Sequence, residues 1–93
     1  MRAAEVRDRV SIVDFLRRHG AEIGHVRGHW VENQAIRCPF HRDENASATV
    51  SRRKGLFNCF TCGMAGDIIT LTEKLQGTDF RGAMEWLERE FRL

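Results

Sequence analysis

The sequence predicts a small α+β fold in which helices at both ends of the chain flank a short antiparallel sheet. Helical periodicity marks the two ends, β-like segments separated by glycine and polar residues occupy the middle, and 93 residues is the length of one small domain. We therefore expect residues 1–93 to form a single domain. Its helices should span about 3–19 and about 67–91, and its sheet about 21–66.

The first helix is predicted from the stretch "SIVDFLRRHG". Ser11 is a suitable N-cap residue, and Asp14 stands at the third helical position, as in a capping box. Ile12, Phe15 and Leu16 fall on one face, while Gly20 provides a stop signal. The preceding "AAEVRDRV" extends the same helical pattern.

The middle of the chain carries the strand signals. The runs "HWV" and "AIRC" predict two strands between residues 21 and 37. The segments "SATVSRR" and "LFNCF", with a turn near Lys54–Gly55, predict a hairpin because β-branched and aromatic residues favour strands.

Two further helices are predicted towards the C-terminal end. "DIITLTEKLQG" begins with an acidic residue and ends at Gly77, and "TDFRGAMEWLEREF" is expected to be capped by Thr78. Apolar residues recur in the last helix at steps of three and four, which predicts a core-facing stripe of Phe80, Ala83, Met84, Leu87 and Phe91.

Four side chains have the spacing of a metal site. Cys38 and His41 are separated by two residues, as are Cys59 and Cys62, and 17 residues lie between the pairs. An odd number of cysteines argues against a closed disulfide framework. Thiolate and imidazole are the usual ligands of tetrahedral structural zinc, so we expect one structural Zn²⁺. His25 and His29 lack a cysteine companion and are expected to be surface residues.

No catalytic constellation accompanies this cluster. A site with four protein ligands has no open position for water or substrate, and the chain has no glycine-rich phosphate loop. Asp43, Glu44 and Asp67 are interpreted as solvated turn and helix-start residues. The sequence has neither a signal peptide nor an apolar run long enough to span a membrane, so we expect a reducing compartment and no membrane partner. Because the four-ligand site is closed and no catalytic residues accompany it, we also expect no enzymatic activity of its own.

Two stretches, "CPFHRDENASATV" and "FNCFTCGMAGDIITLTEKLQGTDFRGAMEWL", resemble the N-terminal zinc-binding domain of bacterial and phage DNA primases of the DnaG type. The resemblance covers nearly the whole chain and implies a zinc ribbon with Cys-His-Cys-Cys ligands. It departs from the family at Asn45-Ala46-Ser47-Ala48, where threonine-proline-serine-phenylalanine is common, and at Ala65, where glycine is common.

The resemblance also implies a function and partners. The family domain binds single-stranded DNA template and assists initiation of the RNA primer, whereas a separate polymerase domain synthesises the primer. A replicative helicase is a further candidate partner, and the implied location is the cytoplasm of a bacterial cell or phage-infected host.

Template contacts are predicted from the basic and aromatic residues in and beside the strands. Basic side chains neutralise phosphates, and exposed aromatic rings stack on unpaired bases. The candidates are Arg27, Trp30, Arg37, Arg52, Arg53, Lys54, Phe57 and Phe60. For Phe57 and Phe60, burial in the core is an equally open interpretation.

Three functional interpretations remain open at this point. The first is a stand-alone primase zinc-binding module that acts with a separately encoded polymerase domain. The second is a protein-interaction or regulatory zinc module of a replication complex, which docks through the acidic C-terminal helix and does not read DNA. The third is an excised piece of a longer primase.

Overall fold

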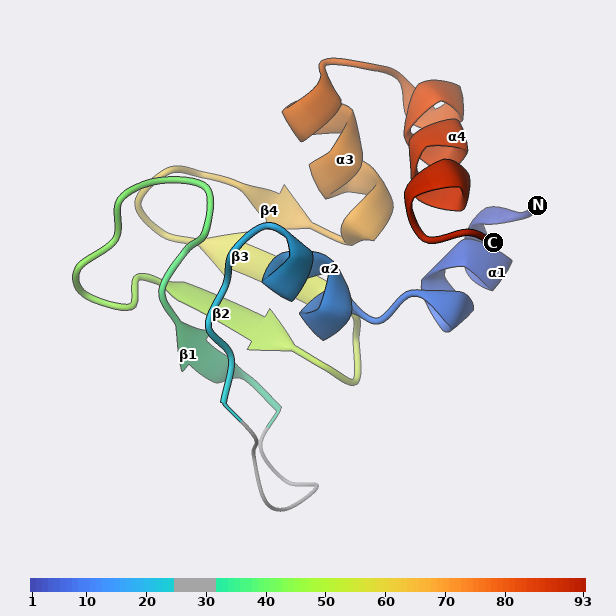
Figure 1. Ribbon diagram of the computed structural model, residues 1–93. Coiled ribbons are helices and arrows are strands. Elements are labelled where there is room, and N and C mark those ends of the chain that lie inside the picture. Colours follow the sequence, from blue (N-terminus) through green and yellow to red (C-terminus); the bar gives the residue numbers. More distant parts are fainter. Residues whose placement is uncertain (25–31) are drawn as a thin grey trace.

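The computed structural model describes residues 1–24 and 32–93 and has the predicted α+β fold (Figure 1). The predicted strand "HWV" lies outside the described residues, as do His25, Arg27, His29 and Trp30. The elements are α1 (Ala3–Arg9), α2 (Ile12–Arg18), β1 (Gln34–Ile36), β2 (Ala48–Ser51), β3 (Leu56–Cys59), β4 (Ala65–Gly66), α3 (Ile68–Gln76) and α4 (Phe80–Glu90).

The N-terminal region forms two helices, so the expectation of one helix over about 3–19 is wrong in this respect. Val10 and Ser11 both adopt extended backbone conformations between α1 and α2. Ser11 is the N-cap of α2, as predicted, and its Oγ accepts a hydrogen bond from the backbone N–H of Asp14 at 3.0 Å. An N-cap residue has non-helical dihedral angles, so a strong cap in the middle of a helical pattern divides it.

The four strands form one antiparallel sheet in the order β1-β2-β3-β4. The predicted hairpin is present, because Ser51 pairs with Leu56 across the turn and Ala48 pairs with Cys59 at the other end. β1 confirms the strand expected around "AIRC". The sheet therefore has two distinct ends, one at the turn 52–55 and the other at Cys59.

The two C-terminal helices pack against each other, and their caps explain their bounds. Asp67 caps α3 by accepting from the backbone N–H of Thr70, and Gly77 ends the helix with a left-handed φ of 60°. For α4 the predicted cap is wrong by one residue. Asp79, not Thr78, is the N-cap and accepts from the backbone N–H of Gly82.

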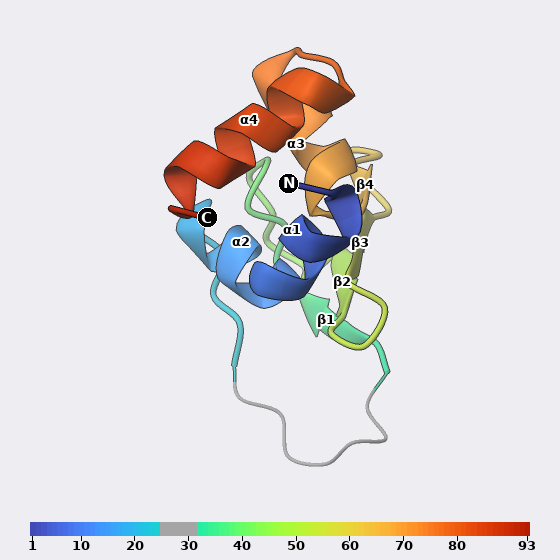
Figure 2. The same cartoon turned by 90° about the vertical axis from the view of Figure 1, so that its right-hand side faces the viewer.

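The hydrophobic core lies between the sheet and the helices, and α1, α2 and α4 all stand on the same side of the sheet (Figure 2). Along β3 the burial alternates, since Phe57 and Cys59 are buried and Leu56 is exposed. The expected stripe on α4 is confirmed at Ala83, Met84 and Leu87, but Phe80 is 52% exposed. Its position in the first turn of α4 leaves it beyond the core. Within the described residues, no helix has the length and apolar character needed to cross a membrane.

An aromatic cluster connects α2, α4 and the segment that follows β1. The His19 ring lies 4.7 Å from that of Phe15, 5.7 Å from Phe40 and 6.0 Å from Trp86, measured between centroids. Phe40 in turn meets the Phe57 ring edge to face at 5.5 Å. His19 Nε2 is buried without a hydrogen-bond partner in the described part of the chain. Burial, reinforced by the positive charge of Arg18, lowers the pKa of His19 below its usual value.

This environment predicts a loss of stability in mild acid. The folded state disfavours protonated His19, so the unfolded chain binds more protons as the pH falls below the ordinary imidazole pKa of about 6.5. The free energy of unfolding should therefore decrease there. His19→Phe removes this contribution, and thermal melts from pH 7.5 to 5.5 should show a smaller decrease in the variant. Zinc loss in acid lowers the stability of the variant and of the unaltered protein alike. If the melting temperatures of the two proteins fall in parallel with pH, His19 is not the cause of the decrease.

Candidate metal centre and nucleic-acid surface

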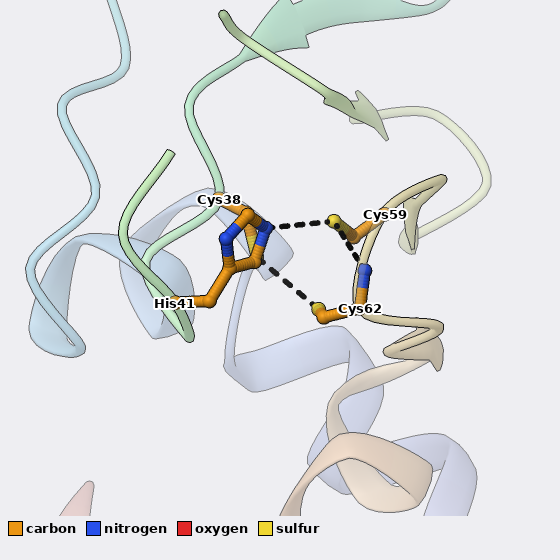
Figure 3. A group of neighbouring side chains, drawn as sticks. All are labelled: Cys38, His41, Cys59 and Cys62. Atoms are coloured by element: carbon orange, nitrogen blue, oxygen red, sulfur yellow. Dashed lines mark hydrogen bonds between the residues drawn. The ribbon is translucent and has the colours of Figure 1, made fainter. Parts of the chain in front are cut away.

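The four predicted metal-binding side chains meet at one end of the sheet (Figure 3). Cys59 is the last residue of β3, and Cys38 lies two residues after the end of β1. His41 and Cys62 come from the turns that follow them. The four potential ligand atoms all lie within 4.8 Å of one another. Two segments far apart in the sequence therefore supply one cluster, as the spacing predicted.

The distances in the cluster fit a tetrahedral zinc site. Two sulfur ligands about 2.3 Å from one ion lie about 3.8 Å apart at the tetrahedral angle. The Sγ atoms of Cys38 and Cys62 are 3.8 Å apart, and His41 Nε2 is 3.3 Å from Cys59 Sγ. A disulfide would need about 2.05 Å between the sulfurs. The donor set and its separations thus fit zinc, and the three cysteines are free thiols.

The orientation of the His41 ring is also suited to metal binding. Its Nδ1 lies 2.9 Å from the carbonyl oxygen of Arg42, to which it donates in the tautomer that leaves Nε2 unprotonated. Such a partner on the second ring nitrogen is a regular feature of zinc-binding histidines. The backbone next to His41 therefore directs Nε2 towards the cluster.

The two buried cysteines have different electrostatic environments. Burial raises the pKa of the Cys38 thiol to about 12. Burial acts in the same direction on Cys59, but the backbone N–H groups of Cys62 and Thr61, together with His41, stabilise its thiolate and lower its pKa to about 6. Zinc binds thiolates, so loading the site releases protons and weakens as the pH falls.

Asp43 organises the first pair of cluster residues, a role that sequence reasoning missed by treating it as a solvated turn residue. Its Oδ2 accepts from the backbone N–H of Cys38 at 2.8 Å and of Ser47 at 2.9 Å, and its Oδ1 accepts from that of Asn45 at 3.3 Å. These bonds hold the pKa of the Asp43 carboxyl well below its usual range, with the N–H of Cys38 as the main cause. The sequence offered one signal for this role, because Asp43 stands only two residues after the candidate ligand His41.

Loss of this carboxylate is expected to weaken metal binding. Asp43→Ala should lower zinc affinity about 10- to 100-fold, the usual effect of removing a group that orients a metal ligand. Competition with a chromophoric chelator measures the change. Glu44→Ala is the matched control, because its carboxylate is 75% exposed and pairs only with Arg42 in the described chain. Equal affinities for the two variants would contradict this role for Asp43.

The face of the sheet turned away from the helices carries polar and exposed apolar side chains, and we call it the open face. A shallow hollow of about 340 Å³ lies along it. Leu56 and Phe60 are exposed, by 44% and 74%. The residues lining the hollow are Asn33, Thr49, Ser51, Lys54, Leu56, Phe57, Asn58, Ala65 and Gly66. Thr49, Leu56 and Asn58 were not predicted as site residues.

The predicted nucleic-acid contacts divide into several groups. Phe57 is only 2% exposed, which corrects its prediction as a stacking residue, because the ring is packed against Phe40 in the core. Phe60 is available for stacking. Arg37 is exposed directly after β1, and its position alternates with that of buried Ile36, so it belongs to the open face.

The three basic residues of the hairpin turn, Arg52, Arg53 and Lys54, are exposed at the end of the sheet opposite the metal cluster. Arg52 donates to the carbonyl oxygen of Gly24 at 3.0 Å and to Gln34 Oε1 at 3.2 Å. Lys54 Nζ pairs with Glu32 at 3.2 Å. The turn is therefore positively charged, and part of its charge is engaged in local contacts.

A Cys-His-Cys-Cys cluster at the end of a small antiparallel sheet, with helices packed on one face, defines a zinc ribbon. Residues 2–93 match the CHC2 zinc finger, the zinc ribbon of DnaG-type primases. The chain belongs to this family, as its motifs indicated, and the family and cluster together support one structural Zn²⁺.

Similar proteins are longer than this chain. A DNA primase of Mycoplasma pneumoniae is 45% identical over 47 residues, which are 50% of this chain and 8% of that protein. A DNA primase of Rickettsia conorii is 36% identical over 75 residues, which are 81% of this chain and 12% of that protein. A crystal structure of the zinc-binding and RNA polymerase domains of Aquifex aeolicus primase matches with a TM-score of 0.67 and 30% identity, covering 94% of this chain and 20% of that chain.

Proposed function

We propose that Cys38, His41, Cys59 and Cys62 are the ligands of the structural zinc, and that residues 1–93 act as one primase-type module. The support is the mutual approach of four donor atoms within 4.8 Å and the orientation of His41 Nε2. With all four positions taken by protein atoms, the ion has a structural role and fixes the end of the sheet. It links the segment after β1 to the end of β3.

We infer that the open face binds single-stranded DNA template. The observation that carries this inference is Phe60, a large aromatic ring that is 74% exposed. It directly follows β3, and the alternation of side chains along that strand puts its position on the side of Leu56 and Asn58. Phe60 directly follows the proposed ligand Cys59, and its backbone N–H donates to the carbonyl oxygen of Ser47 at 3.0 Å. The zinc-held turn thus presents a rigid stacking surface. Stacking on unpaired bases is tolerant of sequence because every base has a π-face.

Other side chains on the open face complement the stacking ring. Arg37 supplies a positive charge for phosphate, and Lys54 supplies a second at the far rim of the hollow. Thr49 and Asn58, directly paired across β2 and β3, offer hydroxyl and amide groups to base edges. The face therefore combines the two elements of single-strand recognition, aromatic stacking and a positively charged path.

In this proposal the chain contributes template contact, and primer synthesis belongs to an RNA polymerase domain. The Aquifex aeolicus primase contains both kinds of domain, which supports a partnership of this type for the present module. A replicative helicase is a further partner we propose from the family relationship, and the module would act in the bacterial or phage-infected cytoplasm, where reduced thiols remain available to zinc.

The test is a matched pair of phenylalanine substitutions. Phe60→Ala should weaken binding of a fluorescent single-stranded oligonucleotide by the zinc-loaded protein by about 5- to 150-fold, because stacking contributes about 1–3 kcal/mol per base. Phe80→Ala is the control, since Phe80 is also exposed but belongs to α4. Equal binding by both variants and the unaltered protein would refute the assignment of the open face.

Exposed Phe80 also favours a second candidate, the protein-interaction module. Here the outer face of α4, with Phe80 and Arg81, would dock on another protein of a replication complex. Phe80→Ala and Arg81→Glu would then impair the replication activity of the assembled complex. Charge reversal at Arg52, Arg53 and Lys54 would leave that activity intact. The template-binding proposal expects the opposite: charge reversal in the turn impairs the activity, and the two α4 substitutions do not.

A further inference from the structure

A groove outside the open face carries a cluster of basic side chains. It has a volume of about 430 Å³ and lies between the hairpin turn, the junction of α1 and α2, and the start of α3. In Figure 1 the turn between β2 and β3 lies on the α1 side of the sheet, away from the loops that carry the metal cluster. Its charged lining residues are Arg7, Asp8, Arg52, Arg53 and Lys54.

The charges around this groove are only partly compensated. Arg7 pairs with Asp67 at 3.3 Å, and Lys54 pairs with Glu32 at 3.2 Å. Arg52 binds neutral oxygen atoms. Arg53 has no ion pair with any other described residue. Among the described lining residues, Arg52 and Arg53 therefore carry two positive charges, against one negative charge on Asp8, which has no ion pair with another described residue.

The cations of the groove's two ion pairs are accessible to solvent. The Arg7 and Lys54 side chains are 48% and 55% exposed, and those of their partners Asp67 and Glu32 are 23% and 45% exposed. Exposed pairs of this kind gain little from their mutual attraction, so an incoming anion can replace the carboxylate as partner. The guanidinium groups offer paired N–H donors that match phosphate oxygens. The groove thus has the charge and the donors for phosphate.

Lys54 connects this groove to the open face, because it lines both hollows. We propose that the groove binds phosphate groups of the same nucleic-acid strand as it passes from the open face over the hairpin turn. This inference rests on the proposed template binding. It extends the path of the bound nucleic acid from the open face across the hairpin turn. Arg53 is the central contact, and Arg7 lies on the α1 side of the groove.

Salt titration of single-strand binding tests this path at Arg53. In a single strand, each neutralised phosphate contributes about 0.7 to the slope of log K against log salt. Arg53→Ala should therefore reduce the slope by about 0.7, and Arg53→Glu should weaken binding further at low salt. Arg53→Lys keeps the charge and should retain most of the slope. Arg53 is an exposed turn residue, so these variants should fold.

The controls separate this inference from the proposed function. Arg81→Ala removes one charge from α4 and should leave the slope unchanged. If Phe60→Ala weakens binding while Arg53→Ala and Arg53→Glu behave as the unaltered protein, the groove is excluded and template binding stands. If Phe60→Ala has no effect, the proposed open-face site fails. Polyglutamate is also added as a competitor of the labelled oligonucleotide. If it competes as effectively as unlabelled oligonucleotide, and if Arg53→Glu abolishes this competition, the groove is a site for acidic protein segments and the inference is overturned.

Discussion

Replacing Cys59 by serine is expected to abolish zinc binding and to unfold the domain at ordinary temperatures. Cys59 is 1% exposed at the end of β3, and its sulfur approaches His41 Nε2 at 3.3 Å. Structural zinc contributes about 10–16 kcal/mol of apparent binding free energy in small zinc fingers. This is as large as the whole stability of a typical domain, about 5–15 kcal/mol. Circular dichroism and metal analysis of the purified variant measure both losses.

Ser47→Ala is the control for this substitution. The Ser47 hydroxyl lies 3.7 Å from Cys59 Sγ, yet it is not a proposed ligand. The control should therefore bind one zinc ion and melt cooperatively. A Cys59→Ser protein that keeps a stoichiometric zinc ion and a native melting transition would contradict the ligand assignment.

Phe57→Ala is expected to destabilise the zinc-loaded domain by about 3–5 kcal/mol, the usual cost of truncating a buried phenylalanine. Phe57 is 2% exposed, packs against the Phe40 ring and belongs to the largest fully buried side chains. Removing it leaves a cavity between the sheet and the helices. Chemical denaturation at saturating zinc measures the free energy of unfolding.

Leu56→Ala provides the comparison within the same strand. Leu56 is 44% exposed on the open face, so its truncation should cost far less stability than that of Phe57. If Phe57→Ala were as stable as Leu56→Ala, the assignment of the two faces of β3 would be wrong. The distinction matters for function, because only one of these faces can receive a nucleic acid.

The parts of the fold that the sequence predicted depend on local chemistry. Ser11, Asp67 and Gly77 each act within one helical turn, so their roles as caps or stop signals could be inferred from neighbouring residues alone. The metal cluster was predictable for a different reason. Two ligands separated by a two-residue spacer occur twice, with a hairpin-length segment between the pairs. Such a pattern can supply the four ligands of a tetrahedral ion regardless of how the rest of the domain packs.

The parts that were missed depend on tertiary packing. Phe57 and Phe60 are an odd number of positions apart, so a regular strand places them on opposite faces, but periodicity does not say which face the helices cover. Asp43 resembles any exposed turn acid until the backbone N–H groups of Cys38 and Ser47 are placed beside it. Phe80 fits the apolar period of α4, yet the core does not extend to the first turn of the helix.

The most direct test of the central claim is amide chemical-shift mapping of the zinc-loaded, isotope-labelled protein during titration with a single-stranded oligonucleotide. We predict that the largest changes fall on the open face, at Thr49, Asn58 and Phe60, and extend to Arg53 in the hairpin turn. Changes confined to the outer face of α4, or no changes at low salt in a folded protein, would contradict template binding by this zinc ribbon.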